Sequence, residues 1–269
     1  MNRINTTLAD LKTEGRKALV SYVVSGDPST AATLPVMHKL VEQGVDIIEL
    51  GVPFSDPMAD GPVITLGHER ALVNGVSLRS TLALVKEFRQ TNKDTPIVLM
   101  GYANPVIRMG YGAFADAAQE AGVDGLLTVD LPPEESVELN VELKRVGIED
   151  IYLIAPTTKP ERIKMIADLA SGFLYYVSLK GVTGAGHLDV DSVSTKVKEI
   201  RSFTNLPLCV GFGIKDAETA KAVGSLADGV VVGSALVKVM GAMGDASGEA
   251  IANAVAEVVT PLRTALDEL

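Results

Sequence analysis

The chain has 269 residues, of which 47% are hydrophobic, enough apolar side chain for one large buried core. Its formal net charge of -10 opposes binding to nucleic acid or to an anionic membrane surface, and its single cysteine, Cys209, excludes an internal disulfide. No signal-peptide pattern is visible, and no apolar stretch reaches the roughly 18 residues of a membrane span, so we expect a soluble, cytoplasmic protein.

Strand and helix patterns alternate along the chain. The first is a short amphipathic helix over Ile4–Lys12, which we expect to cover the core as a lid or plug. Eight apolar, mostly continuous runs then predict strands: Ala18–Val24, Pro96–Gly101, Phe173–Val177, Leu208–Val210, and one each within 43–50, 121–129, 146–154 and 226–233. Helices are expected between them, at Thr33–Gln43, Thr65–Asn74, Leu78–Arg89, Gly112–Glu120, Glu134–Arg145, Pro160–Ala170, Val190–Phe203, Ala217–Val223 and Gly248–Leu269.

A repeated pattern of glycine, acid and strand supports this periodicity. It occurs as QGVDIIEL, AGVDGLLTV, VGIEDIYLI and LADGVVVG in the last four segments above. In each, we expect the glycine at the helix end to adopt the left-handed conformation that returns the chain to the sheet.

Eight strands, each followed by a helix, predict a parallel sheet that closes on itself. We therefore expect a (β/α)8 TIM barrel with an extra N-terminal helix, formed by residues 1–269 as one domain. A doubly wound open sheet would not need eight evenly spaced units, and no GxGxxG motif follows the first strand.

Two acids lie close together in the segment Asp46–Pro62. Glu49 interrupts an apolar strand, where burial would raise the pKa of its carboxyl toward neutral pH, and Asp60 follows in a Gly- and Pro-rich loop. Such a pair suits general acid–base catalysis. The alternatives are structural: Glu49 would cap a loop amide or pair with a cation, and Asp60 would cap the next helix.

Glycine-rich loops follow the last three expected strands. GFGI at 211–214 and GSAL at 233–236 let backbone N–H groups approach an anion, which predicts a phosphate site after strands seven and eight. Either motif alone would also serve a tight turn. The segment SLKGVTGAGHLD after strand six would be either a closing loop or a flexible solvated one.

Other chemistries lack their motifs. The histidines are scattered, with no HExxH or paired-cysteine spacing, so no metal site is expected. No GxSxG elbow is present, and Lys180 would lack the desolvated setting that an imine-forming lysine needs.

Several motifs together resemble the tryptophan synthase alpha subunit family. They are IELGVPFSDPMADGP at 48–62, GYANP at 101–105, LKGVTGA at 179–185, VGFGI at 210–214 and VGSAL at 232–236. The resemblance implies a lyase that cleaves indole-3-glycerol phosphate to indole and glyceraldehyde 3-phosphate by a retro-aldol reaction. Glu49 would then be the catalytic acid and base, and Asp60 would stabilise the charge that develops at the indole N–H.

The resemblance also implies roles for other positions. Tyr22, Met100, Leu127, Tyr175 and Phe212 would line the indole pocket, Tyr102 and Thr183 would orient the carboxylates, and Gly184, Gly213, Gly233 and Ser234 would bind phosphate. Tyr22 and Met100 replace the family's more common Phe and Leu while keeping bulk.

A partner is implied as well. The family works as an α2β2 complex in which indole passes to a beta subunit that carries pyridoxal phosphate, so this chain would need no cofactor of its own. Pro53, Asp56, Asn104 and Pro132 match interface positions and would face that partner. Two rival functions are a sugar-phosphate isomerase or epimerase, which would need a different acid–base pair or a metal, and a non-catalytic phosphate-binding barrel that activates a partner.

Overall fold

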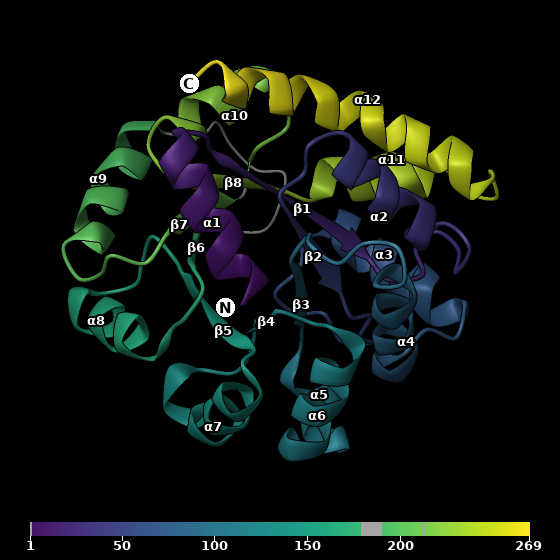
Figure 1. Cartoon of the computed structure of the whole chain (residues 1–269), viewed down its shortest axis with the longest axis horizontal. Coiled ribbons are helices and arrows are strands. Elements are labelled where there is room, and N and C mark those ends of the chain that lie inside the picture. Colours follow the sequence, from purple (N-terminus) through teal and green to yellow (C-terminus); the bar gives the residue numbers. More distant parts are fainter. Residues whose placement is uncertain (1, 179–189, 212) are drawn as a thin grey trace.

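Eight parallel strands form a closed barrel in the computed structural model, which describes residues 2–178, 190–211 and 213–269 (Figure 1). The strands are β1 (Ala18–Val24), β2 (Ile47–Gly51), β3 (Ile97–Gly101), β4 (Gly125–Thr128), β5 (Glu149–Ile154), β6 (Leu174–Val177), β7 (Leu208–Gly211) and β8 (Gly229–Val232). Each strand pairs with the next in sequence, and β8 pairs with β1. The predicted (β/α)8 barrel is therefore confirmed.

Helices surround this barrel (Figure 1). They are α1 (Arg3–Glu14), α2 (Thr33–Glu42), α3 (Pro62–Val73), α4 (Leu78–Phe88), α5 (Ala103–Met109), α6 (Tyr111–Ala121), α7 (Val137–Val146), α8 (Pro160–Leu169), α9 (Val190–Arg201), α10 (Ala217–Gly224), α11 (Ser234–Met243) and α12 (Gly248–Asp267), with a 3-10 turn at Pro133–Glu135. None of these helices, over the described residues, is both long and apolar enough to cross a membrane.

The helix predictions need three corrections. The helix expected from Glu134 begins at Val137, because the 3-10 turn precedes it. The sequence pattern also missed α5 and α11. Pro105 lies in the first turn of α5, where its missing N–H costs no helical hydrogen bond, and α11 is apolar because it packs between α3 and α12.

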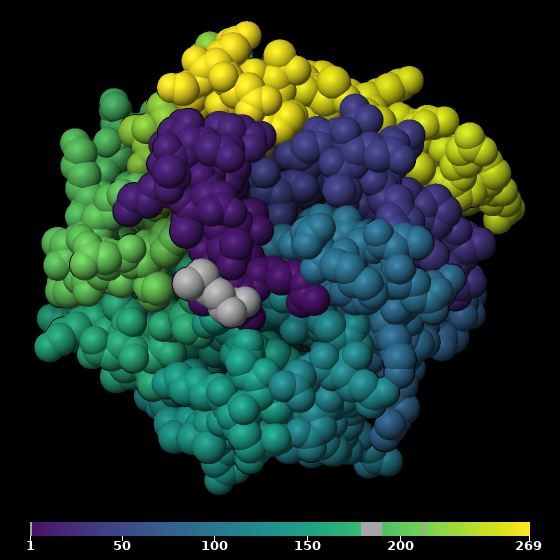
Figure 2. Space-filling model, in the orientation of Figure 1, coloured from purple at the N-terminus to yellow at the C-terminus, as the bar shows by residue number. Residues whose placement is uncertain are grey.

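The N-terminal helix closes one end of the barrel. Ile4, Leu8 and Leu11 of α1 are buried in the same cluster as the inward-facing barrel residues Val20 and Val98. Figure 2 shows α1, in purple, lying across the middle of the corresponding face. The expected plug is confirmed, and it leaves the opposite end, where the strands terminate, for a ligand.

One glycine prediction was wrong. Gly44, Gly122 and Gly147 end their helices with positive φ, but Gly229 lies inside β8 and does not. Its function is close packing, because an added Cβ would lie 2.7 Å from the Cβ of Ala18 and 3.0 Å from Cys209 Sγ.

Candidate functional site

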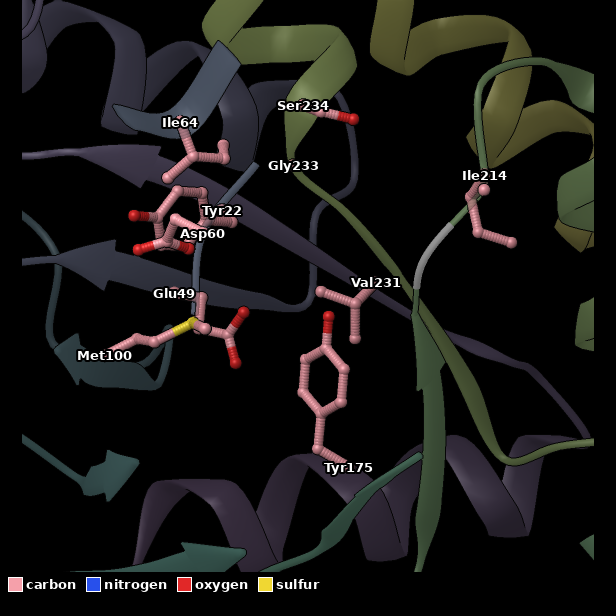
Figure 3. Close-up of a pocket in the computed structure, with 11 residues that line it drawn as sticks. Tyr22, Glu49, Asp60, Ile64, Met100, Tyr175, Ile214, Val231, Gly233 and Ser234 are labelled. Atoms are coloured by element: carbon pink, nitrogen blue, oxygen red, sulfur yellow. The ribbon is translucent and has the colours of Figure 1, made fainter. Parts of the chain in front are cut away.

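A pocket opens at the C-terminal ends of the strands, where barrels of this kind bind their ligands. It is lined by Tyr22, Glu49, Asp60, Ile64, Met100, Tyr175, Gly213, Ile214, Val231, Gly233 and Ser234 (Figure 3). Eight of these residues were predicted from sequence. Among the residues that the structure describes, no His, Cys, Asp or Glu side chains are grouped as a metal site.

Glu49 is the buried acid of this pocket. It pairs with Tyr22 in the register of β1 and β2, and its carboxyl projects into the pocket (Figure 3). The residue is 0% exposed, and neither carboxyl oxygen meets a hydrogen-bond partner among the described residues. Because nothing compensates for the lost water, desolvation raises the pKa of Glu49 to about 8. The carboxyl is therefore protonated at neutral pH.

Asp60 is held quite differently. The N-cap of α3 is Gly61 and makes no side-chain cap bond, with Pro62 as the first helical residue, so Asp60 is not the helix cap. Instead, Asp60 Oδ2 accepts a hydrogen bond of 2.8 Å from the Tyr102 hydroxyl. Its Oδ2 also lies 3.3 Å from Nε2 of His68. The loop setting thus gives Asp60 polar partners that Glu49 lacks.

Two tyrosines, Tyr22 and Tyr175, line the pocket. The Tyr22 hydroxyl lies over Gly51, and the Tyr175 hydroxyl lies over Gly211, where a Cβ at either glycine would collide with the ring. Desolvation raises the pKa of both tyrosines well above the ordinary value, and the nearby acids add to the shift. Both rings therefore stay uncharged and offer flat, largely apolar surfaces to a ligand.

One edge of the pocket suits an anion. Gly233 and Ser234 lie where α11 begins, and no side chain caps this helix start. Uncapped N–H groups and the helix dipole favour negative charge there. By contrast, α10 begins with a capping box formed by Asp216 and Thr219, and the described residues between β7 and α10 that line the pocket are Gly213 and Ile214. None of the described lining residues is Lys or Arg.

The remaining predicted ligand residues lie elsewhere. Leu127 is fully buried in the barrel cluster below the pocket and does not line it. Tyr102 contacts Asp60 rather than the pocket itself. Thr183, Gly184 and Phe212 lie outside the described residues.

The four expected partner positions are not alike. Asp56, Asn104 and Pro132 are exposed, in the β2–α3 loop, in the first turn of α5 and beside the 3-10 turn. Pro53 is buried. It therefore presents no free side chain to a partner and instead supports the loop on which Asp56 lies.

Sequence reasoning missed Ile64, Ile214 and Val231, which line the pocket, and His68, which lies behind it. The sequence does indicate that His68 shares a helix face with Ile64, because side chains four residues apart lie on the same face of a helix. Val231 alternates with the outward-facing residues of β8, and that alternation is hidden in a run of valines.

Comparison with known proteins shows which family the chain belongs to. The family model described as tryptophan synthase alpha chain matches residues 8–266. The chain belongs to the tryptophan synthase alpha chain family. A curated alpha chain from Marinobacter nauticus is 56% identical over 100% of this chain and 99% of its own length.

Solved structures give the same result. The tryptophan synthase subunit alpha of Legionella pneumophila superposes with a TM-score of 0.91 at 41% identity, covering 100% of both chains. A chain in the tryptophan synthase complex of Pyrococcus furiosus superposes with a TM-score of 0.82 at 38% identity, covering 92% of this chain and 98% of that one. The resemblance inferred from the motifs is confirmed over the whole chain.

The raised pKa of Glu49 predicts a stability difference that depends on pH. Its carboxyl ionises near the ordinary value of 4.5 in the unfolded chain and at about 8 in the folded chain. Between these values the folded chain holds a proton that the unfolded chain has lost, so raising the pH lowers the free energy of unfolding by about 1.4 kcal/mol per unit. Glu49→Gln removes this loss. Between pH 4.5 and 8, the free energy of unfolding of the variant, measured with urea, should rise relative to that of the wild type by on the order of 4 kcal/mol.

The matched control is Asp10→Asn, which changes an exposed carboxyl on α1. Its stability difference from the wild type should change little over the same pH range. If the difference in free energy of unfolding between Glu49→Gln and the wild type does not change with pH, then Glu49 ionises as an ordinary carboxyl.

Proposed function

We propose that the chain cleaves indole-3-glycerol phosphate to indole and glyceraldehyde 3-phosphate, as the alpha subunit of tryptophan synthase. The observation that carries this proposal is the protonated, unpartnered Glu49 in a pocket with flat apolar walls and an anion-binding edge. Membership of the family agrees with it. The substrate has matching parts: a flat indole ring, a reacting carbon and a phosphate.

Glu49 would move the protons of the reaction. Its carboxyl gives a proton to the ring carbon that carries the glycerol chain, and the resulting carboxylate then takes the proton of the adjacent hydroxyl. As that O–H breaks, an aldehyde forms, the carbon–carbon bond cleaves, and its electron pair returns to the ring as indole. The carboxyl ends the cycle protonated, so no other acid, base or cofactor is needed. The pKa of about 8 keeps the starting form populated at neutral pH.

Asp60 would stabilise the ring while it carries the extra proton. Protonation of the ring carbon places positive charge at the indole nitrogen, and an N–H···carboxylate bond is strongest at that point. Asp60 Oδ2 is already engaged by Tyr102, whereas no described residue donates to Oδ1. Oδ1 is thus the oxygen available to the indole N–H.

The phosphate would lie at the edge formed by Gly213, Gly233 and Ser234. A phosphate monoester carries about two negative charges, and the chain has a net charge of -10, so attraction must be local. The uncapped start of α11 supplies that attraction through backbone N–H groups and the helix dipole. Gly184, outside the described residues, is proposed to contribute as the family pattern implies.

The beta subunit is the proposed partner, in an α2β2 complex that receives the indole. The pyridoxal phosphate of the overall reaction belongs to that subunit, and this chain needs no cofactor. Asp56, Asn104 and Pro132 are exposed where the partner would bind, and we propose the cytoplasm as the location. The rival isomerase or epimerase would need a different acid–base pair or a metal. Among the described residues, no His, Cys or Lys joins Glu49 and Asp60 in the pocket lining, and no group of side chains could hold a metal ion. A regulatory barrel would have no use for an unpaired buried acid, whose burial destabilises the fold.

The first test is Glu49→Ala. Because the variant removes the only proposed proton donor, indole release from indole-3-glycerol phosphate should fall by at least about a thousandfold, with or without the beta subunit. The circular dichroism spectrum and binding to the beta subunit should be retained. Glu69→Ala, which changes an exposed glutamate on α3, should release indole at the wild-type rate. Unchanged turnover in Glu49→Ala would rule out the mechanism.

The second test is Asp60→Asn, which keeps the side-chain shape but removes its charge. We expect kcat for indole release to fall about a hundredfold, while affinity for glyceraldehyde 3-phosphate changes by less than about threefold. Steady-state kinetics and product inhibition measure the two quantities. Equal losses in both would instead indicate that Asp60 holds the loop and contributes nothing to the chemistry.

A further inference from the structure

His68 is a buried histidine that neither the mechanism nor the pocket lining uses. It lies on α3 with only 1% of its surface exposed, and its two ring nitrogens face opposite ends of the β2–α3 loop. Nδ1 accepts a hydrogen bond of 3.1 Å from the backbone N–H of Phe54. Nε2 lies 3.3 Å from Asp60 Oδ2. One side chain therefore touches both the start of the loop and the carboxylate near its end.

The Phe54 contact determines where the imidazole carries its proton. A ring nitrogen that accepts an N–H bond has no proton of its own, so the neutral ring must be protonated on Nε2. That nitrogen is the one that faces Asp60. Nε2 is buried and makes no aligned hydrogen bond to any described residue, and the Asp60 carboxylate is the acceptor within reach. The N–H of His68 is therefore available to Asp60.

Tyr102 contacts the same carboxylate oxygen, Oδ2 of Asp60. Its hydroxyl donates to Asp60 Oδ2 at 2.8 Å and accepts from the backbone N–H of Ala59 at 3.0 Å. The Tyr102 ring stacks on Phe54, with centroids 5.1 Å apart, and meets the His68 ring edge-on at 6.4 Å. The printed interactions of the Asp60 carboxylate with described side chains are thus both at Oδ2, and none is at Oδ1.

We infer that His68 is a positioning residue for Asp60: Nδ1 fixes the loop at Phe54, and the Nε2–H holds Oδ2 so that Oδ1 faces the indole N–H. This inference rests on the proposed function of Asp60 in cleaving indole-3-glycerol phosphate. Because Asp60 is on a loop, Tyr102 would otherwise be the one described residue whose side chain fixes the direction of its carboxylate. A loss of alignment affects the transition state more than the bound substrate.

Two substitutions separate the functions of the two nitrogens. The Asn amide reaches the position of Nδ1, so His68→Asn keeps an acceptor for Phe54 and loses the donor to Asp60. The longer Gln amide reaches the position of Nε2, so His68→Gln keeps that donor. We expect His68→Asn, assayed with the beta subunit, to lower kcat for indole release about tenfold with KM within about threefold. His68→Gln should recover most of that loss, and His38→Asn, on α2, should match the wild type.

A double-mutant cycle distinguishes positioning from general support of the fold. If His68 acts through Asp60, then His68→Asn should lower kcat about tenfold in the wild-type background and less than about twofold in Asp60→Asn. Equal effects in both backgrounds, or an unchanged kcat in His68→Asn, would overturn the inference.

A spectroscopic readout is independent of turnover. Nitrogen-15 NMR of the imidazole, assigned with His68→Asn, should show a neutral ring with the proton on Nε2, and the Nε2 resonance should shift in Asp60→Asn. A proton on Nδ1, or no response to Asp60→Asn, would contradict the inference. If the wild type releases no indole, the proposed function fails, whereas the NMR result still decides whether His68 contacts Asp60.

Discussion

The site depends on the burial of one carboxyl without a partner. Glu49 lies on a strand of a closed barrel, where both neighbouring strands and the pocket walls exclude water and no described residue donates to it. Its pKa therefore rises to about 8, which turns an ordinary acid into a proton donor at neutral pH. Burial of Glu49 destabilises the fold, and apolar packing in the rest of the barrel offsets this. That packing includes Ile4, Leu8 and Leu11 of α1, which fill the other end of the barrel.

Asp60 and the proposed phosphate edge depend on different interactions from those of Glu49. Asp60 lies on a loop, where its Oδ2 accepts a hydrogen bond from Tyr102 and lies 3.3 Å from Nε2 of His68. The proposed phosphate edge would use the uncapped start of α11, whose local dipole would attract the anion without a lysine or arginine despite the net charge of -10. The proposed proton donor, charge stabiliser and anion site would thus lie in different electrostatic surroundings. This separation would let two acids in one pocket have two functions.

The sequence predicted most of the fold because strands buried on both faces are continuous apolar runs and glycines mark helix ends. Glu49 was predictable for the same reason, since a lone acid in an apolar strand stands out. Contacts between distant segments were not predictable from local patterns. The Tyr102–Asp60 contact was expected only through the family resemblance, the His68–Phe54 bond was not expected at all, and α11 was missed because its apolarity reflects packing between α3 and α12. The helix-cap alternative for Asp60 could be removed only when the structure placed Gly61 at the cap.

The protonation of Glu49 is tested most directly by the infrared difference spectrum of the wild type against Glu49→Gln at pH 7. A buried, unpartnered Glu49 should give the carbonyl stretching band of a protonated carboxylic acid, present only in the wild type, that shifts in deuterium oxide and disappears as the pH rises past about 8. A spectrum that contains only carboxylate bands for Glu49 at pH 7 would contradict this prediction, because the chain would then have no proton to give to the indole ring.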